Sequence, residues 1–135
     1  MLERVIDFFN SNPKGWLATV DQYGCPRTRP FLFLMELHGR LFWGTDRSKD
    51  VYEQLHNNPL VEFGSTSVSL QTIRVRGEVV FSENREVKRL AWEKYEILKK
   101  IFVTEDNQDW EVFYLDHGQA LFYHSPADEP EIIDF

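Results

Sequence analysis

Most of the chain arranges its apolar residues in the short runs that predict β-strands. Apolar side chains either alternate with polar ones or fill brief continuous runs, and turn residues separate the runs. The run PFLFLM in the second predicted strand is apolar at consecutive positions, which indicates burial on both faces. The predicted strands lie at 16–20, 27–37, 40–44, 60–66, 73–81, 112–115 and 120–123.

Three segments instead repeat their apolar residues at helical spacing, at 2–9, about 48–58 and about 84–101. The third predicted helix carries a dense charged face that we expect to be solvated. Short turns such as Asp21–Gly24, and Asp116–Gly118 in a predicted hairpin, join strands that run antiparallel.

This order of elements predicts a mainly β fold of the α+β class, with six to seven antiparallel strands and peripheral helices. Antiparallel strands in this number commonly remove their exposed edges by closing into a small barrel, and an open α+β sheet is the alternative. With 135 residues, we expect a single domain over 1–135, with an extended acidic tail at about 125–135.

Charge is unevenly distributed along the chain, although the net charge is −7. Residues 101–135 hold 9 acidic side chains and no Lys or Arg, which leaves 22 − 9 = 13 acids against 15 bases in the first hundred residues. Nucleic-acid binding needs a basic face, so we expect no nucleic-acid partner. One small anionic ligand remains compatible with this distribution.

Other sequence features narrow the class of protein further. The lone Cys25 cannot form an intrachain disulfide, and the four histidines lack metal-ligand spacing, so we expect no metal site. No signal peptide and no run of about 20 apolar residues is present. We expect a cytoplasmic protein without membrane contact.

The stretch 41–49, LFWGTDRSK, predicts a buried strand that leads directly into a helix start bearing two hydroxyls and two cations. Free backbone N–H groups and the helix dipole favour an anion at such a position. We therefore expect a phosphate here. The alternative is an ordinary helix cap by Ser48 or Asp46 with a solvated Lys49.

Three pieces of the sequence together resemble the pyridoxamine 5′-phosphate oxidase-like family with its FMN-binding split barrel. They are WLATVDQYGCPRTRPFLFL, GRLFWGTDRSKDVYEQLHNNP and TIRVRGEVVF, and their order and spacing cover about 16–81. The resemblance implies a split β-barrel that forms a homodimer, with FMN bound at the dimer interface.

The resemblance also implies which residues hold the cofactor. The backbone of Pro30, Phe31 and Leu32 is implied to lie along the flavin ring. A guanidinium can bind a phosphate with two parallel hydrogen bonds, whereas a lysine supplies a point charge. The implied phosphate ligands are Arg29, Thr45, Ser48 and Lys49, with Arg27 and Arg47 as weaker candidates and Asp46 beside them.

Departures from the family pattern bear on the substrate. Leu34 stands where members that oxidise pyridoxamine phosphate have a basic residue, and Gln71 or Thr72 stands near the place of a glutamine. Residues 101–135 lack the basic segment that holds a substrate phosphate. We therefore expect no oxidation of pyridoxamine phosphate itself.

Two ligand-binding functions remain open, and an interaction protein without a ligand is a third possibility. The first is a small flavin-dependent oxidoreductase that exchanges electrons with a nicotinamide or a small organic partner. The sequence shows no nucleophile–base or paired-carboxylate arrangement, so it identifies no catalytic residue, as is common where a cofactor supplies the chemistry. The second is a non-catalytic binding module that holds flavin, haem or another phosphate-bearing ligand for storage or sensing.

Overall fold

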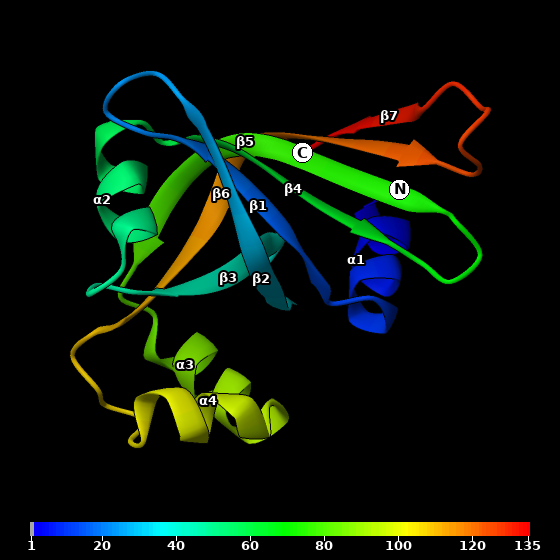
Figure 1. Cartoon of the computed structure of the whole chain (residues 1–135). Helices are drawn as coiled ribbons and strands as arrows, with labels where there is room; N and C mark the ends of the chain where they lie inside the picture. Colours follow the sequence, from blue (N-terminus) through cyan, green and yellow to red (C-terminus); the bar gives the residue numbers. More distant parts are fainter. Residues whose placement is uncertain (1) are drawn as a thin grey trace.

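The computed structural model describes residues 2–135, which form seven strands and four helices (Figure 1). The strands are β1 (Lys14–Val20), β2 (Pro26–Leu37), β3 (Arg40–Asp46), β4 (Leu60–Thr66), β5 (Thr72–Ser82), β6 (Trp110–Tyr123) and β7 (Glu131–Asp134). The helices are α1 (Leu2–Ser11), α2 (Asp50–Asn57), α3 (Arg85–Lys94) and α4 (Glu96–Phe102). Within residues 2–135, no helix has the length and apolarity needed to cross a bilayer.

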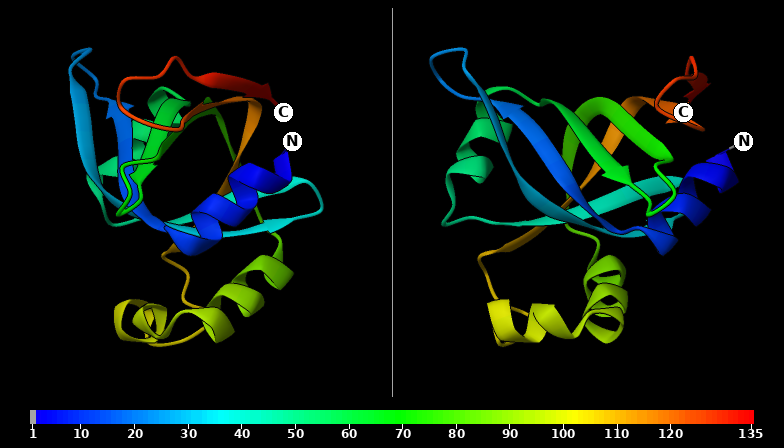
Figure 2. Two further views of the ribbon diagram at one scale, coloured as in Figure 1. Left: turned by 90° about the vertical axis from the view of Figure 1, so that its right-hand side faces the viewer. Right: turned by 45° about the vertical axis from the view of Figure 1, so that its right-hand side comes forward.

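The sheet closes into a barrel. Its strand order is β3-β2-β1-β4-β5-β6-β7, with every neighbouring pair antiparallel, and β3 also pairs with β6. Strand β6 is long enough to pair with β5 along one edge and with β3 and then β7 along the other. The predicted mainly β antiparallel barrel is therefore confirmed, with six closed strands and one added strand (Figure 2).

Aromatic side chains fill the barrel interior. Trp43, Phe63 and Phe113 are fully buried there, because alternate residues of each strand point inward. Helix α1 lies across one opening of the barrel and α2 lies at the other (Figures 1 and 2). Each helix buries apolar side chains in the same core, Phe9 from α1 and Leu55 from α2.

A second, smaller core lies between the outer surface of the barrel and helices α3 and α4. Leu34 of β2 and Phe42 of β3 meet Ala91, Phe102 and Trp110 in this core, and all five are buried. The predicted burial of both faces of β2 is therefore confirmed, because its inner face packs in the barrel and its outer face packs under these helices.

The single helix predicted over 84–101 is wrong, because the segment forms two helices. Helix α3 ends at Lys94 and α4 begins at Glu96, and Tyr95 between them has extended backbone angles. The Tyr95 hydroxyl donates a hydrogen bond of 2.9 Å to the carbonyl oxygen of Phe33 in β2. The break therefore coincides with a tertiary contact that helical periodicity does not reveal.

The hairpin predicted around 116–118 is also wrong. These residues lie inside the continuous strand β6, where the register with β5 shifts between Arg76 and Glu78. His117 takes a positive φ of 50° at this irregularity. The turn-forming residues thus produce a bulge, because β5 continues to pair with β6 on both sides of it.

The acidic stretch 125–135 includes the short strand β7, which was not predicted. Strand β7 pairs with β6 from Glu131 opposite Phe122 to Asp134 opposite Gln119. The Glu131 carboxylate also accepts hydrogen bonds from Arg4 of α1 at 2.8 and 2.9 Å. This stretch is therefore held on the barrel by backbone pairing and by an ion pair to the first helix.

Candidate functional site

A mainly apolar hollow of about 380 Å³ lies between β2, the end of β3, the start of α2 and helix α4, and we call it the apolar hollow. It brings together two parts of the sequence that were expected to meet, the 29–32 segment of β2 and the end of the 41–49 stretch. The predicted site residues that line it are Arg29, Pro30, Phe31, Leu32, Thr45, Asp46 and Lys49.

A second hollow of about 930 Å³, the polar hollow, lies between the β1–β2 turn and α2. Arg27 and Ser48 line this hollow and not the apolar one, whereas Arg29 and Lys49 line both. Arg47 lines neither hollow, because its guanidinium forms an ion pair with Glu111 of β6. The hydrogen bond to that carboxylate raises the pKa of Arg47.

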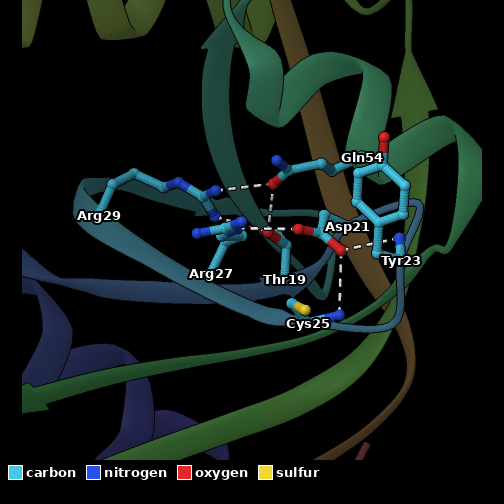
Figure 3. A network of polar contacts seen from close by, with 7 residues as sticks. All are labelled: Thr19, Asp21, Tyr23, Cys25, Arg27, Arg29 and Gln54. Atoms are coloured by element: carbon cyan, nitrogen blue, oxygen red, sulfur yellow. Dashed lines mark hydrogen bonds and ion pairs between the residues drawn. The ribbon is translucent and has the colours of Figure 1, made fainter.

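The guanidinium of Arg29 is partly buried, and its hydrogen-bond partners are all uncharged (Figure 3). Its guanidinium donates to Thr19 Oγ1 at 2.7 Å, to Gln54 Oε1 at 2.7 Å and to the Leu17 carbonyl oxygen at 3.3 Å. Burial lowers its pKa, and the attraction of Asp50 acts in the opposite direction. Because Arg29 forms no ion pair within residues 2–135, its charge remains available to an anion.

Thr45 supplies a hydroxyl that lacks a partner. Its side chain is only 6% exposed, and Oγ1 has no hydrogen-bond partner among residues 2–135. A buried hydroxyl without a hydrogen bond is unfavourable, so such groups in native proteins need an explanation. A ligand oxygen in the apolar hollow would provide the missing partner.

The carboxylate of Asp46 organises the turn between β3 and α2. Its Oδ1 accepts from the Ser48 backbone N–H at 2.8 Å and from the Ser48 hydroxyl at 2.7 Å. The alternative in which Asp46 or Ser48 caps the helix is not realised, because the N-cap residue is Lys49 and no side chain caps α2. The Lys49 ammonium has neither a hydrogen bond nor an ion pair within residues 2–135.

The 30–32 backbone belongs to an irregular part of β2. The register between β2 and β3 shifts between Phe33 and Met35, immediately after the segment implied to lie along a flavin ring. Lys94 donates to the Leu34 carbonyl oxygen at 3.1 Å, next to the hydrogen bond from Tyr95 to Phe33. The corner between α3 and α4 therefore holds this wall of the apolar hollow.

Helix α4 forms the opposite wall, which the sequence analysis missed. Ile97 and Ile101 are 48% and 51% exposed although both are large and apolar. They are four residues apart in the sequence, and this apolar pair at i and i+4 was the signal that could have revealed them. The other missed lining residues are Lys14, Leu34, Gly44, Val51, Leu98, Phe102 and Trp110.

Gly44 and Trp110 meet beside the apolar hollow. A Cβ at Gly44 would lie 2.9 Å from Nε1 of the Trp110 indole, so this position accommodates little more than glycine. The indole N–H is buried and has no hydrogen-bond partner among residues 2–135. The hollow thus has an unpartnered donor near its apolar side in addition to the hydroxyl of Thr45.

The arrangement suits a flat, mainly apolar molecule that carries an anion at one end. Basic and hydroxyl groups gather where β2, β3 and α2 meet, and aliphatic and aromatic side chains form the remaining walls. Within residues 2–135 no group of three or more His, Cys, Asp or Glu side chains is placed to hold a metal ion. The lining of the apolar hollow also contains no His, Cys, Met or Tyr.

Comparison with known proteins identifies relatives of this chain. A family model described as pyridoxamine 5′-phosphate oxidase matches residues 1–120. The crystal structure of a NimC/NimA family protein from Clostridium acetobutylicum is 31% identical, with a TM-score of 0.86, over 98% of this chain and 91% of that chain. No match was found among the curated proteins.

Two further solved structures share the fold at lower identity. General Stress Protein 26 from Bacillus anthracis is 19% identical with a TM-score of 0.82, and the alignment covers 99% of this chain and 98% of that chain. A heme binding protein from Mycobacterium smegmatis is 17% identical with a TM-score of 0.76, over 97% of this chain and 55% of that chain.

Proposed function

The chain belongs to the pyridoxamine 5′-phosphate oxidase family, and from this premise we propose that it binds FMN and acts as a small oxidoreductase. One observation carries the proposal. At one end of the apolar hollow, Arg29 and Lys49 lack ion pairs within residues 2–135 and the buried Thr45 hydroxyl lacks a hydrogen-bond partner. A phosphate joined to a flat ring would satisfy all three groups at once.

The residues that line the apolar hollow suit both the phosphate and the flat ring of FMN. Arg29, Thr45 and Lys49 would bind the phosphate. The hydroxyl and the backbone N–H of Ser48 both donate to Asp46, so Ser48 would bind the phosphate only after exchanging one of these hydrogen bonds. The ring would lie between the 30–32 backbone and the α4 wall formed by Ile97 and Ile101.

FMN would supply the redox chemistry, and the chain would orient the ring and exclude water from it. The apolar walls lower the local dielectric around the ring, which strengthens its hydrogen bonds. The indole N–H of Trp110 is a further donor at this wall.

The same walls bear on the substrate. Leu34 lines the apolar hollow together with Ile97 and Ile101, so these three positions offer no cation to a second phosphate. We therefore propose that the electron acceptor is a small uncharged molecule and not pyridoxamine phosphate.

We further propose that the protein is a homodimer. Ile97 and Ile101 leave apolar surface exposed at the hollow, and Trp16 is 58% exposed on the outer face of β1. Exposed apolar surface of this kind is typical of interfaces. A second chain that covers it would complete the flavin site.

The direct test is the absorption spectrum of the purified protein, before and after incubation with FMN and gel filtration. We expect the absorption spectrum of a protein-bound flavin. Mass spectrometry of the ligand released from the protein should identify it as FMN. Lys49→Met should weaken binding of FMN about tenfold and binding of riboflavin much less, because only FMN carries the phosphate. A protein that stays colourless after incubation contradicts the proposal.

A non-catalytic binding module is the second candidate. The heme binding protein from Mycobacterium smegmatis shares the fold. Haem, like FMN, combines a flat ring with anionic groups. Haem iron, however, is usually held by His, Cys, Met or Tyr, and the apolar hollow is lined by none of them. The two candidates are distinguished by the rate at which NADH or NADPH reduces the bound flavin. Reduction faster than that of free FMN supports the oxidoreductase, and its absence supports the binding module.

A further inference from the structure

We propose that the polar hollow binds the adenosine diphosphate group of a dinucleotide, so that FAD or NADH binds across the phosphate site. The proposal rests on the proposed function only for the place of the phosphate next to the apolar hollow. The polar hollow is the larger of the two, about 930 Å³, and ligand sites of this kind commonly measure about 300–1,000 Å³.

The two hollows share Arg29 and Lys49, the two cations proposed to bind the phosphate. Arg29, Lys49 and Val51 line both of them, so a phosphate bound there would face the polar hollow as well as the apolar one. A mononucleotide would end at this point. A pyrophosphate would continue into the polar hollow, along the cations that the two hollows share.

One face of helix α2 presents groups suited to a ribose beyond the phosphate. Asp50, Glu53 and Asn57 line the polar hollow at spacings of three and four residues, so they lie on the same side of the helix. Their side chains form no hydrogen bond or ion pair within residues 2–135. Carboxylates accept hydrogen bonds from ribose hydroxyls, as in dinucleotide sites that prefer an unphosphorylated ribose.

These carboxylates also predict a choice between dinucleotides. A 2′-phosphate on the ribose would lie near Asp50 and Glu53 and be repelled by them. The remaining cation in the hollow, Arg27, is neutralised by Asp21 at 2.9 Å. We therefore expect NADH and FAD to be accepted and NADPH to be disfavoured.

An exposed aromatic ring completes the polar hollow. Tyr23 is 79% exposed on the β1–β2 turn. The Asp21 carboxylate holds the turn by accepting from the backbone N–H groups of Tyr23 and Cys25, both at 2.9 Å, and from Arg27 (Figure 3). An aromatic side chain on a preorganised turn is suited to stacking on a nucleobase.

The test is isothermal titration calorimetry of the full chain with FMN, FAD, ADP, NADH and NADPH. We expect FAD to bind about tenfold or more tightly than FMN, and ADP to bind without any flavin. Tyr23→Ala and Asn57→Ala should each weaken the binding of ADP and of FAD about tenfold and leave the affinity for FMN unchanged. The matched control Tyr23→Phe retains the ring and should retain binding of ADP and FAD.

The ligands separate the possible sources of the adenosine diphosphate group. A gain for FAD over FMN identifies a flavin dinucleotide, and binding of NADH to the flavin-free protein in competition with FMN identifies a nicotinamide dinucleotide. Glu53→Gln should narrow the preference for NADH over NADPH severalfold, because it removes a charge that repels the 2′-phosphate.

The outcomes distinguish this inference from the proposed function. If FMN binds, FAD binds no more tightly and ADP does not bind, the inference fails and the proposed function stands. If no flavin binds but ADP binds and depends on Tyr23, the proposed function fails and the inference stands. Binding of ADP that Tyr23→Ala and Asn57→Ala leave unchanged contradicts the inference.

Discussion

At the residue scale, two buried threonines show how differently a hydroxyl can be placed. Thr19 is 2% exposed, donates to Gln54 Oε1 at 2.6 Å and accepts from Arg29 at 2.7 Å. Thr45 is 6% exposed and its hydroxyl has no partner among residues 2–135. One hydroxyl is therefore satisfied within the fold, and the other is buried without a partner.

Replacing Thr45 should have opposite effects on stability and on binding. Thr45→Val keeps the shape and removes the unsatisfied hydroxyl, so the free energy of unfolding without ligand should rise by about 1 kcal/mol. Affinity for FMN should fall about tenfold, measured by fluorescence titration. Thr19→Val is the control and should lower stability, because Gln54 and Arg29 each lose one hydrogen bond. Equal destabilisation by both variants would contradict this account of Thr45.

Gly15 of β1 packs directly against Phe63 and Gly64 of β4. A Cβ on Gly15 would overlap the carbonyl oxygen of Gly64 and lie 2.6 Å from the ring of Phe63. At Gly64 itself, a Cβ would find its nearest neighbour at 3.5 Å, an ordinary contact. The two glycines therefore sit on neighbouring strands with very different room for a side chain.

Gly15→Ala should destabilise the protein strongly, by about 3 kcal/mol or more, because backbone would have to move. Gly64→Ala on the neighbouring strand is the matched control and should change stability by less than about 1 kcal/mol. Urea unfolding of both variants measures the difference. Similar midpoints for the two variants would show that the strands separate more easily than the packing indicates.

At the element scale, the corner between α3 and α4 connects both walls of the apolar hollow. Tyr95 and Lys94 donate to successive carbonyl oxygens of β2, those of Phe33 and Leu34. Burial raises the pKa of the Tyr95 hydroxyl, so it remains a protonated donor at neutral pH. Helix α4 starts at the next residue, Glu96, so the same corner also sets the position of the α4 wall.

Tyr95→Phe should lower the free energy of unfolding by about 1–2 kcal/mol, because the Phe33 carbonyl oxygen loses its donor. Tyr114→Phe is the control, since the Tyr114 hydroxyl forms no hydrogen bond within residues 2–135 and its ring contacts are retained. Chemical denaturation monitored by circular dichroism compares the two. Equal stabilities would mean that water replaces the lost donor without cost.

At the scale of the whole molecule, the first helix and the last strand are tied together on the closed barrel. Arg4 and Glu131 form an ion pair at 2.8 Å, and His124 Nε2 lies 3.2 Å from the same carboxylate. The hydrogen bonds from His124 and Arg4 lower the pKa of Glu131 from its ordinary 4.5. The contribution of this carboxylate to stability is therefore present above its unfolded-state pKa and lost as pH falls through the lower folded-state value.

Glu131→Gln should reduce the amount by which the free energy of unfolding decreases at acidic pH. In the wild type, we expect the free energy of unfolding to decrease as pH falls from about 5 to 3, partly through protonation of Glu131. The variant should show a smaller decrease over this range and a slightly lower stability at neutral pH. Glu129→Gln, an exposed glutamate without an ion pair within residues 2–135, serves as the control. Parallel pH profiles for the wild type and Glu131→Gln would refute the role of this carboxylate.

The sequence by itself determined the class of fold and the place of the candidate site. Alternation, apolar runs and turn residues are local signals, so they identified most strands and the burial of β2 on both faces. The hydroxyl and basic residues of 41–49 and Arg29 were recognisable from chemistry and spacing. Whether these residues hold FMN stays a prediction.

Only the tertiary structure decided which of these groups are free. Arg47 is held by Glu111, 64 residues away, whereas Arg29 reaches Gln54 and keeps its charge without an ion pair within residues 2–135. The break at Tyr95, the continuity of β6 and the α4 wall likewise depend on contacts between distant segments. Periodicity reports the environment of one segment, and it does not show which other segment supplies the partner.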